Sequence, residues 1–151
     1  RTTGNPTMHD AGSRVNAVPS TAPARVDGRF LPGYEDEFWA ALATLAGPDV
    51  EITRDVRLSA IETAYDGEVP DAMTAAILAE DPDAVVAPYL MSGGTDAKYW
   101  EDLGMRCFGF TPLRLPEDLD FPAMFHGVDE RVPVDSLEFG ARVFDRFLGL
   151  L

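Results

Sequence analysis

The sequence is poor in the residues that form disulfides and zinc sites, with one cysteine and two histidines among 151 residues. The single cysteine, Cys107, excludes an intramolecular disulfide and a structural zinc site of the multi-cysteine kind. One cysteine also fits a reducing compartment, so a cytoplasmic location is expected. Neither His9 nor His126 has another histidine or a cysteine nearby in the sequence. Taken alone, each is therefore predicted to be an ordinary loop residue.

Basic residues are also scarce, and long apolar runs are absent. The chain has 12 Lys and Arg against 26 Asp and Glu, a formal net charge of −14 and a pI near 4.3. This negative field repels phosphate backbones and anionic lipid, so nucleic acid and membrane are not expected partners. No run is long enough to span a bilayer, and the opening RTTGNPTMHDAG is not a signal peptide. Because the chain does not begin with methionine, we expect it to be a piece of something longer.

The first third of the chain has the pattern of short strands around one helix. Runs rich in β-branched and aromatic residues predict the strands, and turn-forming residues separate them. Acidic residues in a first turn, an apolar stripe and a Gly-Pro stop predict the helix. The predicted elements are strands at Ser13–Ser20, Ala24–Gly33 and Val50–Leu58, and a helix at Glu35–Gly47. The order β-β-α-β is typical of an antiparallel α+β sandwich.

The strand at Ala24–Gly33 alternates with a period of two, so its side chains are expected on two different faces. The predicted faces are Val26, Gly28 and Phe30 on one side, and Asp27, Arg29 and Leu31 on the other.

The pattern changes near Tyr65, which predicts a domain boundary between residues 1–65 and 66–151. Beyond it, helices alternate with fully apolar strands, which indicates an α/β layer with parallel pairing. The predicted elements are helices at 70–80, 97–104 and 134–151, and strands at 84–90 and 105–110. Neither part has enough strands for a complete sheet.

The terminal helix has a plausible N-cap at Asp135. Its spacing predicts a buried stripe of Leu137, Phe144, Phe147, Leu148 and Leu151.

A glycine turn, MSGGTDAKYW, follows an apolar strand and opens a helix. Gly93 and Gly94 would let backbone N–H groups approach an anion, while Thr95 could add a hydroxyl and Lys98 a positive charge. Asp96 could cap the helix. The alternative is a plain turn that needs glycine for a positive φ, and the pattern is neither a P-loop nor a dinucleotide fingerprint.

Two further side chains are ambiguous on their own. Arg29 could clamp a carboxylate with its planar guanidinium, or pair at the surface with Asp27. Asn16 could bind a substrate through its amide, or satisfy local backbone groups.

Taken in order, the segments RVNAVPSTAPARVDGRFLPG, VVAPYLMSGGTDAKYWEDLG and FHGVDERVPVDSL resemble the C-terminal portion of the M20 family of metal-dependent hydrolases. That family contains carboxypeptidases, aminoacylases, deacetylases and dipeptidases. The resemblance implies a partial antiparallel α+β lid (dimerisation) domain at 1–65 and the C-terminal segment of an α/β catalytic domain at 66–151. It also implies a homodimer formed through the lid.

The resemblance implies hydrolysis of the amide bond of N-acyl amino acids or dipeptides by a zinc-activated water. It places His126 as a ligand of one of two zinc ions, with Asp129 or a backbone carbonyl as acceptor for its other ring nitrogen. The remaining ligands and the general base fall outside this chain, so no catalytic residue is assigned and the chain alone is expected to be inactive.

The resemblance also implies the substrate-binding residues, which are Asn16, Arg29, Gly93, Gly94, Thr95 and Lys98. Many relatives carry an arginine where this chain has Lys98, and lysine keeps the charge but loses the bidentate fork. The competing hypothesis is a non-catalytic dimerisation or binding module that lacks the metal-binding half. Nucleotide binding through the glycine turn ranks below both hypotheses, because too few strands are predicted for a doubly wound sheet.

Overall fold

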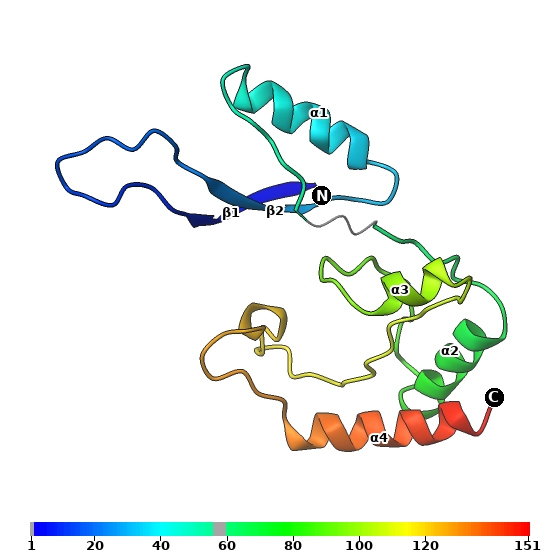
Figure 1. The fold of residues 1–151 in the computed structure, drawn as a ribbon. Coiled ribbons are helices and arrows are strands. Elements are labelled where there is room, and N and C mark those ends of the chain that lie inside the picture. Colours follow the sequence, from blue (N-terminus) through cyan, green and yellow to red (C-terminus); the bar gives the residue numbers. More distant parts are fainter. Residues whose placement is uncertain (1, 56–59) are drawn as a thin grey trace. The chain divides into compact units, whose positions relative to one another are not determined.

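The computed structural model describes residues 2–55 and 60–151, which form a mixed α+β structure (Figure 1). The chain divides into two compact units. Unit 1 is Arg1–Glu62 with Met91–Met105, and unit 2 is Thr63–Leu90 with Arg106–Leu151. Among the described residues, no helix is long and apolar enough to cross a membrane.

Unit 1 contains a two-stranded antiparallel sheet, in which β1 (Thr3–His9) pairs with β2 (Ala24–Arg29). The prediction of the second strand is confirmed over Ala24–Arg29. The predicted strand at Ser13–Ser20 is wrong, because this segment lies in the exposed connection between β1 and β2. Prolines at 19 and 23 provide no N–H for a ladder, which disfavours a strand there.

The partner of β2 is instead β1, where no strand was predicted. Pro6 and its polar neighbours Asn5 and Thr7 do not have the composition typical of a strand. The pairing is irregular between Pro6 and Met8, as expected where a proline interrupts a ladder. Within this irregularity, the Thr7 hydroxyl donates to the backbone carbonyl of Arg25 at 3.4 Å. A bulge therefore lets a proline-containing segment pair with β2.

Helix α1 (Glu35–Ala46) confirms the predicted helix, with three acidic residues in its first turn and Gly47 after its last residue. Gly47 has a φ of 77°, a left-handed conformation that favours glycine. Phe38 of α1 packs against Gly28 of β2 and against Phe30, the residue after β2, with the Phe30 and Phe38 ring centroids 5.5 Å apart. The predicted two-faced alternation of β2 is therefore confirmed on this side.

The predicted strand at Val50–Leu58 is wrong over Val50–Asp55, where the structure shows no strand. The rest of that prediction falls on residues 56–59, which lie outside the described residues. Helix α3 (Ala97–Asp102) confirms the short predicted helix of this unit.

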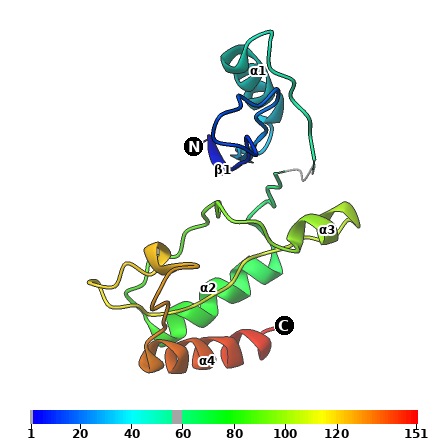
Figure 2. The same ribbon diagram turned by 60° about the vertical axis from the view of Figure 1, so that its left-hand side comes forward.

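Unit 2 is built on two helices, α2 (Glu68–Glu80) and α4 (Val134–Leu148), which lie side by side in both views (Figures 1 and 2). A short 3-10 turn at Pro122–Met124 precedes α4. The two predicted helices are thus confirmed. Their buried apolar side chains form the core of the described part of this unit: Ala72, Met73, Ala76, Phe139, Val143 and Phe147.

The apolar runs at 84–90 and 105–110 are not strands in the structure, so the prediction of an α/β layer with parallel pairing is wrong for the described residues. A parallel strand requires neighbours on its ladder, and these runs have no strand partner within the described chain. Val85 and Tyr89 are 94% and 85% exposed, respectively. The hydrophobicity of Val85 and Tyr89 is therefore not sufficient to bury them.

Helix α4 departs from its predicted cap and stripe. Pro133 is the N-cap residue, and Asp135 lies in the first turn. Of the predicted stripe, only Phe147 is buried; Leu137, Phe144, Leu148 and Leu151 are exposed. The buried face instead includes the small residues Ser136 and Gly140.

These two small residues explain why the buried face of α4 differs from the predicted stripe. The Ser136 hydroxyl donates to the carbonyl of Arg114 at 2.6 Å, and a Cβ at Gly140 would lie 3.0 Å from the carbonyl oxygen of Pro112. The chain at 112–114 thus lies directly against this side of α4. A count of large apolar residues overlooks such a contact, because it is made by a serine and a glycine.

Glu80 at the end of α2 links the two helices through ion pairs. Arg146 and Arg142 of α4 both donate to its carboxylate, the latter at 2.8 Å. The hydrogen bonds from Arg146 and then Arg142 hold the pKa of Glu80 below its ordinary value. A depressed carboxylate pKa contributes stability that is present above the unfolded-state pKa, about 4.3, and is lost as the pH falls through the folded-state value.

We expect Glu80→Gln to lower the urea midpoint of unit 2 at pH 7, because both guanidinium groups lose their charged partner. The difference from the wild type should shrink as the pH is lowered from 5 toward 3. Asp81→Asn is the matched control, since the Asp81–Arg114 pair is long at 3.8 Å and should change stability by only about 0.5 kcal/mol or less. A difference that persists unchanged at low pH would contradict the assigned role of the ion pairs.

Candidate functional site

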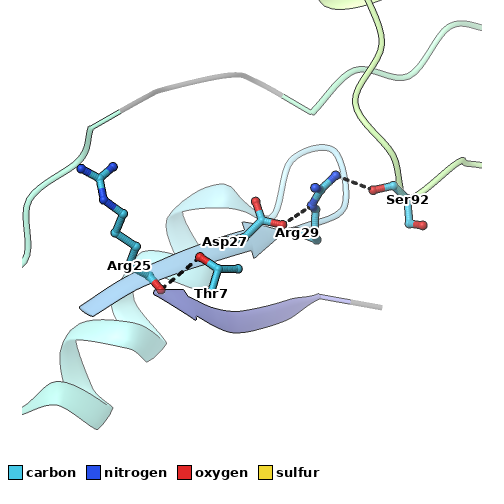
Figure 3. Close-up of polar contacts among 5 residues, drawn as sticks. All are labelled: Thr7, Arg25, Asp27, Arg29 and Ser92. Carbon is cyan, nitrogen blue, oxygen red and sulfur yellow. Dashed lines mark hydrogen bonds and ion pairs between the residues drawn. The ribbon is translucent and has the colours of Figure 1, made fainter. Parts of the chain in front are cut away.

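Arg29, at the end of β2, lies in a network of three groups in unit 1 (Figure 3). Its Nε donates to Oδ2 of Asp27 at 2.6 Å, and its Nη1 donates to the backbone carbonyl of Ser92 at 3.0 Å. Asp27 and Arg29 are two residues apart in a strand, so their side chains leave the same face. Arg29 therefore connects β2 to the turn that contains the two glycines.

The guanidinium group retains donors for a ligand. Arginine has five N–H donors, and its Nη2 makes no hydrogen bond to the described part of the chain. The side chain of Arg29 is 44% exposed, so a solute can reach it. Of the two interpretations of Arg29, the ion pair with Asp27 is formed in the structure. This ion pair leaves guanidinium donors for a ligand, so it is compatible with the other interpretation, the carboxylate clamp.

The turn Ser92–Thr95 precedes α3, and Lys98 of α3 lies against it. Lys98 folds back over Gly94, where an added Cβ would lie 3.3 Å from the Lys98 Nζ. Arg29 and Lys98 thus both reach this turn in a chain with a net charge of −14. Arg29 is paired with Asp27, and both cations can offer N–H donors to an anion such as a carboxylate.

The interpretation of this turn as one that needs glycine for a positive φ is wrong. Neither Gly93 nor Gly94 has a φ in the left-handed region, whereas five other glycines of the described chain do. A Cβ at Gly93 would lie 3.5 Å from Met91, an ordinary contact, and one at Gly94 would meet the flexible end of Lys98. The turn is exposed, and its two glycines have no left-handed conformation.

The start of α3 also differs from its prediction. Asp96 is the N-cap residue by position, but its side chain makes no capping hydrogen bond. Instead, the Thr95 hydroxyl accepts from the backbone N–H of Ala97 at 3.3 Å. The Thr95 hydroxyl can still donate its own hydrogen to a ligand.

Asn16 lies in the exposed connection between β1 and β2. The structure does not bring it into the network of Arg29 and Ser92. Its predicted role in substrate binding stays a prediction.

His126 lies in an exposed loop of unit 2 and has a φ of 60°, which is uncommon for a residue with a side chain. Its backbone N–H donates to Oε2 of Glu130 at 3.2 Å. Asp129, also with a positive φ, pairs with Arg131 at 2.6 Å. One oxygen of Asp129, a candidate acceptor for the His126 ring, therefore binds an arginine.

The described residues contain no group of three or more His, Cys, Asp or Glu side chains arranged to hold a metal ion. The donors of this part of the chain therefore do not fit a complete zinc site. Sequence reasoning did not anticipate Ser92 and Glu130 as partners. Ser92 acts through a main-chain carbonyl, which any residue type possesses, so the sequence carries no signal for it.

Comparison with known proteins finds a similarity to a protein with a carboxypeptidase-like description. The chain is 30% identical over 140 residues, 90% of its length, to a Dictyostelium discoideum protein described as "Probable carboxypeptidase S-like 2". The chain spans 27% of that protein's length. No family model and no solved structure matches the chain.

Proposed function

We propose that this chain is part of an M20-type zinc-dependent hydrolase that cleaves the amide bond of N-acyl amino acids or dipeptides. The observation that carries the proposal is the convergence of Arg29 and Lys98 on the Ser-Gly-Gly-Thr turn. Both substrate classes end in a carboxylate, which can accept hydrogen bonds from an arginine and a lysine. The similarity to a carboxypeptidase-like protein over most of the chain supports the same class of substrate.

The residues of the turn would hold the substrate rather than react with it. The Nη2 of Arg29 would donate to one carboxylate oxygen, and Lys98 would neutralise the charge as a point cation. The Thr95 hydroxyl and the N–H groups of Gly93 and Gly94 would fix the orientation. Holding the substrate in one orientation lowers the entropic part of the barrier to hydrolysis.

The metal belongs to the complete enzyme in this proposal. His126 would supply one zinc ligand, and the described residues lack the further donors of a complete site. We therefore propose that the isolated chain is inactive. The complete enzyme would be a cytoplasmic homodimer joined through the lid domain, and Asn16 of the lid would reach the substrate.

The test is a nuclear magnetic resonance titration of this chain with N-acetylmethionine and with its uncharged amide. We expect the carboxylate form to shift the signals of Gly93, Gly94 and the Arg29 side chain, and the amide to shift them far less. Arg29→Ala should weaken binding of the carboxylate form by about 10-fold or more, since hydrogen bonds to charged groups contribute roughly 1.5–3 kcal/mol.

The matched control is Arg25→Ala, because Arg25 lies on the same strand and pairs with Asp55 instead of the glycine turn. It should leave binding unchanged. Equal shifts with the two ligands would contradict the proposal and favour a non-catalytic module. Hydrolysis of N-acetylmethionine by the zinc-supplemented chain would contradict the proposed inactivity.

A further inference from the structure

Asp27 lies between two arginines of the same strand face, Arg25 and Arg29, and pairs with only one of them. Arg25 donates to Oδ2 of Asp55 at 2.8 Å, whereas Arg29 donates to Oδ2 of Asp27 at 2.6 Å. Figure 3 shows the Arg29 guanidinium between Asp27 and the Ser92 carbonyl, with Arg25 directed elsewhere. Within the described part of the chain, the Asp27 carboxylate is thus paired with Arg29 and not with Arg25.

The strand backbone fixes both members of this pair. Asp27 lies opposite Asn5 and Arg29 opposite Thr3 in the β1–β2 ladder. On the other face of β2, the ring of Phe38 packs against Gly28. Asp27 and Arg29 therefore leave the face of β2 opposite Phe38, at the spacing that the strand sets.

We propose that Asp27 is a positioning residue that orients Arg29 for the substrate carboxylate, an inference that rests on the proposed function. A free arginine side chain has several rotatable bonds, and ordering it on binding costs conformational entropy. Asp27 holds Nε and the Ser92 carbonyl holds Nη1, so the plane of the guanidinium is set before a ligand arrives. Nη2 then remains for the ligand.

Two effects of Asp27 on carboxylate binding have opposite signs. Its negative charge repels an incoming carboxylate, so removal of the charge alone should strengthen binding. Its hydrogen bond to Nε preorganises Arg29, so removal of that acceptor should weaken binding. Substitutions that separate charge from hydrogen bonding therefore distinguish positioning from simple electrostatics.

The experiment compares Asp27→Ala with Asp27→Asn by titration of the whole chain with N-acetylmethionine, with nuclear magnetic resonance as the readout. We expect Asp27→Ala to weaken binding by about threefold to tenfold, the effect of freeing one long side chain. Asp27→Asn should restore binding to at least the wild-type level, because the amide oxygen still accepts from Nε. The Arg29 Nε–H signal should exchange faster with water in Asp27→Ala than in the wild type.

Arg25→Ala is the matched control, since Arg25 pairs with Asp55 and its removal should change neither the binding nor the Arg29 signal. Binding by Asp27→Ala that equals or exceeds the wild-type affinity would overturn the positioning role. If Arg29→Ala weakens binding in the same series, only the positioning role has failed. If Arg29→Ala has no effect, the proposed carboxylate recognition fails together with it.

Discussion

Phe147→Ala is expected to destabilise the α2–α4 unit by about 3–5 kcal/mol, the usual cost of removing a buried phenylalanine. Phe147 is 8% exposed, and its ring centroid lies 5.2 Å from that of Phe110. The loss includes both the apolar surface returned to water and the cavity left in the core. Because small domains are stable by only about 5–15 kcal/mol, this change should remove a large part of the total.

The matched control is Phe144→Ala, one helical turn away on α4. Phe144 contacts the same Phe110 ring at 5.2 Å but is 40% exposed, so its removal should cost roughly 1 kcal/mol. Urea denaturation, monitored by hydrogen exchange of the α2 and α4 amides, measures the loss of stability in both variants. Equal losses would show that the buried face of α4 is the one predicted from the sequence.

Gly28→Ala is expected to destabilise unit 1 by about 1–3 kcal/mol, because β2 and α1 approach closely at this glycine. A Cβ at position 28 would lie 2.7 Å from Cζ and 2.8 Å from Cε1 of Phe38, so the ring must move. Alanine would otherwise be neutral or favourable in a strand interior, since glycine loses more backbone entropy on folding. A loss of stability therefore reports the steric contact.

Gly4→Ala provides the control, because Gly4 lies directly opposite Gly28 in the ladder. A Cβ at position 4 would lie 3.5 Å from Cε2 of Phe38, an ordinary van der Waals distance. This variant should be as stable as the wild type or slightly more stable. Thermal unfolding of unit 1, monitored by the fluorescence of the neighbouring Trp39, measures both changes in stability. A stable Gly28→Ala protein would contradict the assigned packing of α1 on β2.

Local patterns in the sequence predicted the helices well. Acidic residues in a first turn, a glycine stop and apolar spacing are short-range signals, and α1, α2, α3 and α4 form where those signals lie. The alternation of β2 also held, because the period of a strand places Gly28 and Asp27 on opposite faces whatever the partner strand is.

The strands were predicted poorly because a strand depends on a partner distant in sequence. The runs at 84–90 and 105–110 have the composition of buried strands, but neither has a ladder neighbour in the described chain. Conversely, Thr3–His9 became a strand despite Pro6, because β2 offered an edge and a bulge accommodated the proline.

The candidate site shows the same division. Charge, residue type and spacing were enough to single out Arg29, the two glycines and Lys98 from the sequence. Their convergence was not predictable, because Arg29 and Ser92 are 63 residues apart and meet through a main-chain carbonyl.

The sequence by itself determined the helices, the two faces of β2 and the residue types that suit a carboxylate ligand, since these follow from local geometry and chemistry. Only the tertiary structure decided that Asp27 pairs with Arg29 rather than Arg25, and that Lys98 folds over Gly94. It also decided that Ser136 and Gly140 set the buried side of α4. The reason is that these contacts depend on which parts of the backbone lie close together in space, and this proximity cannot be read from the residue types.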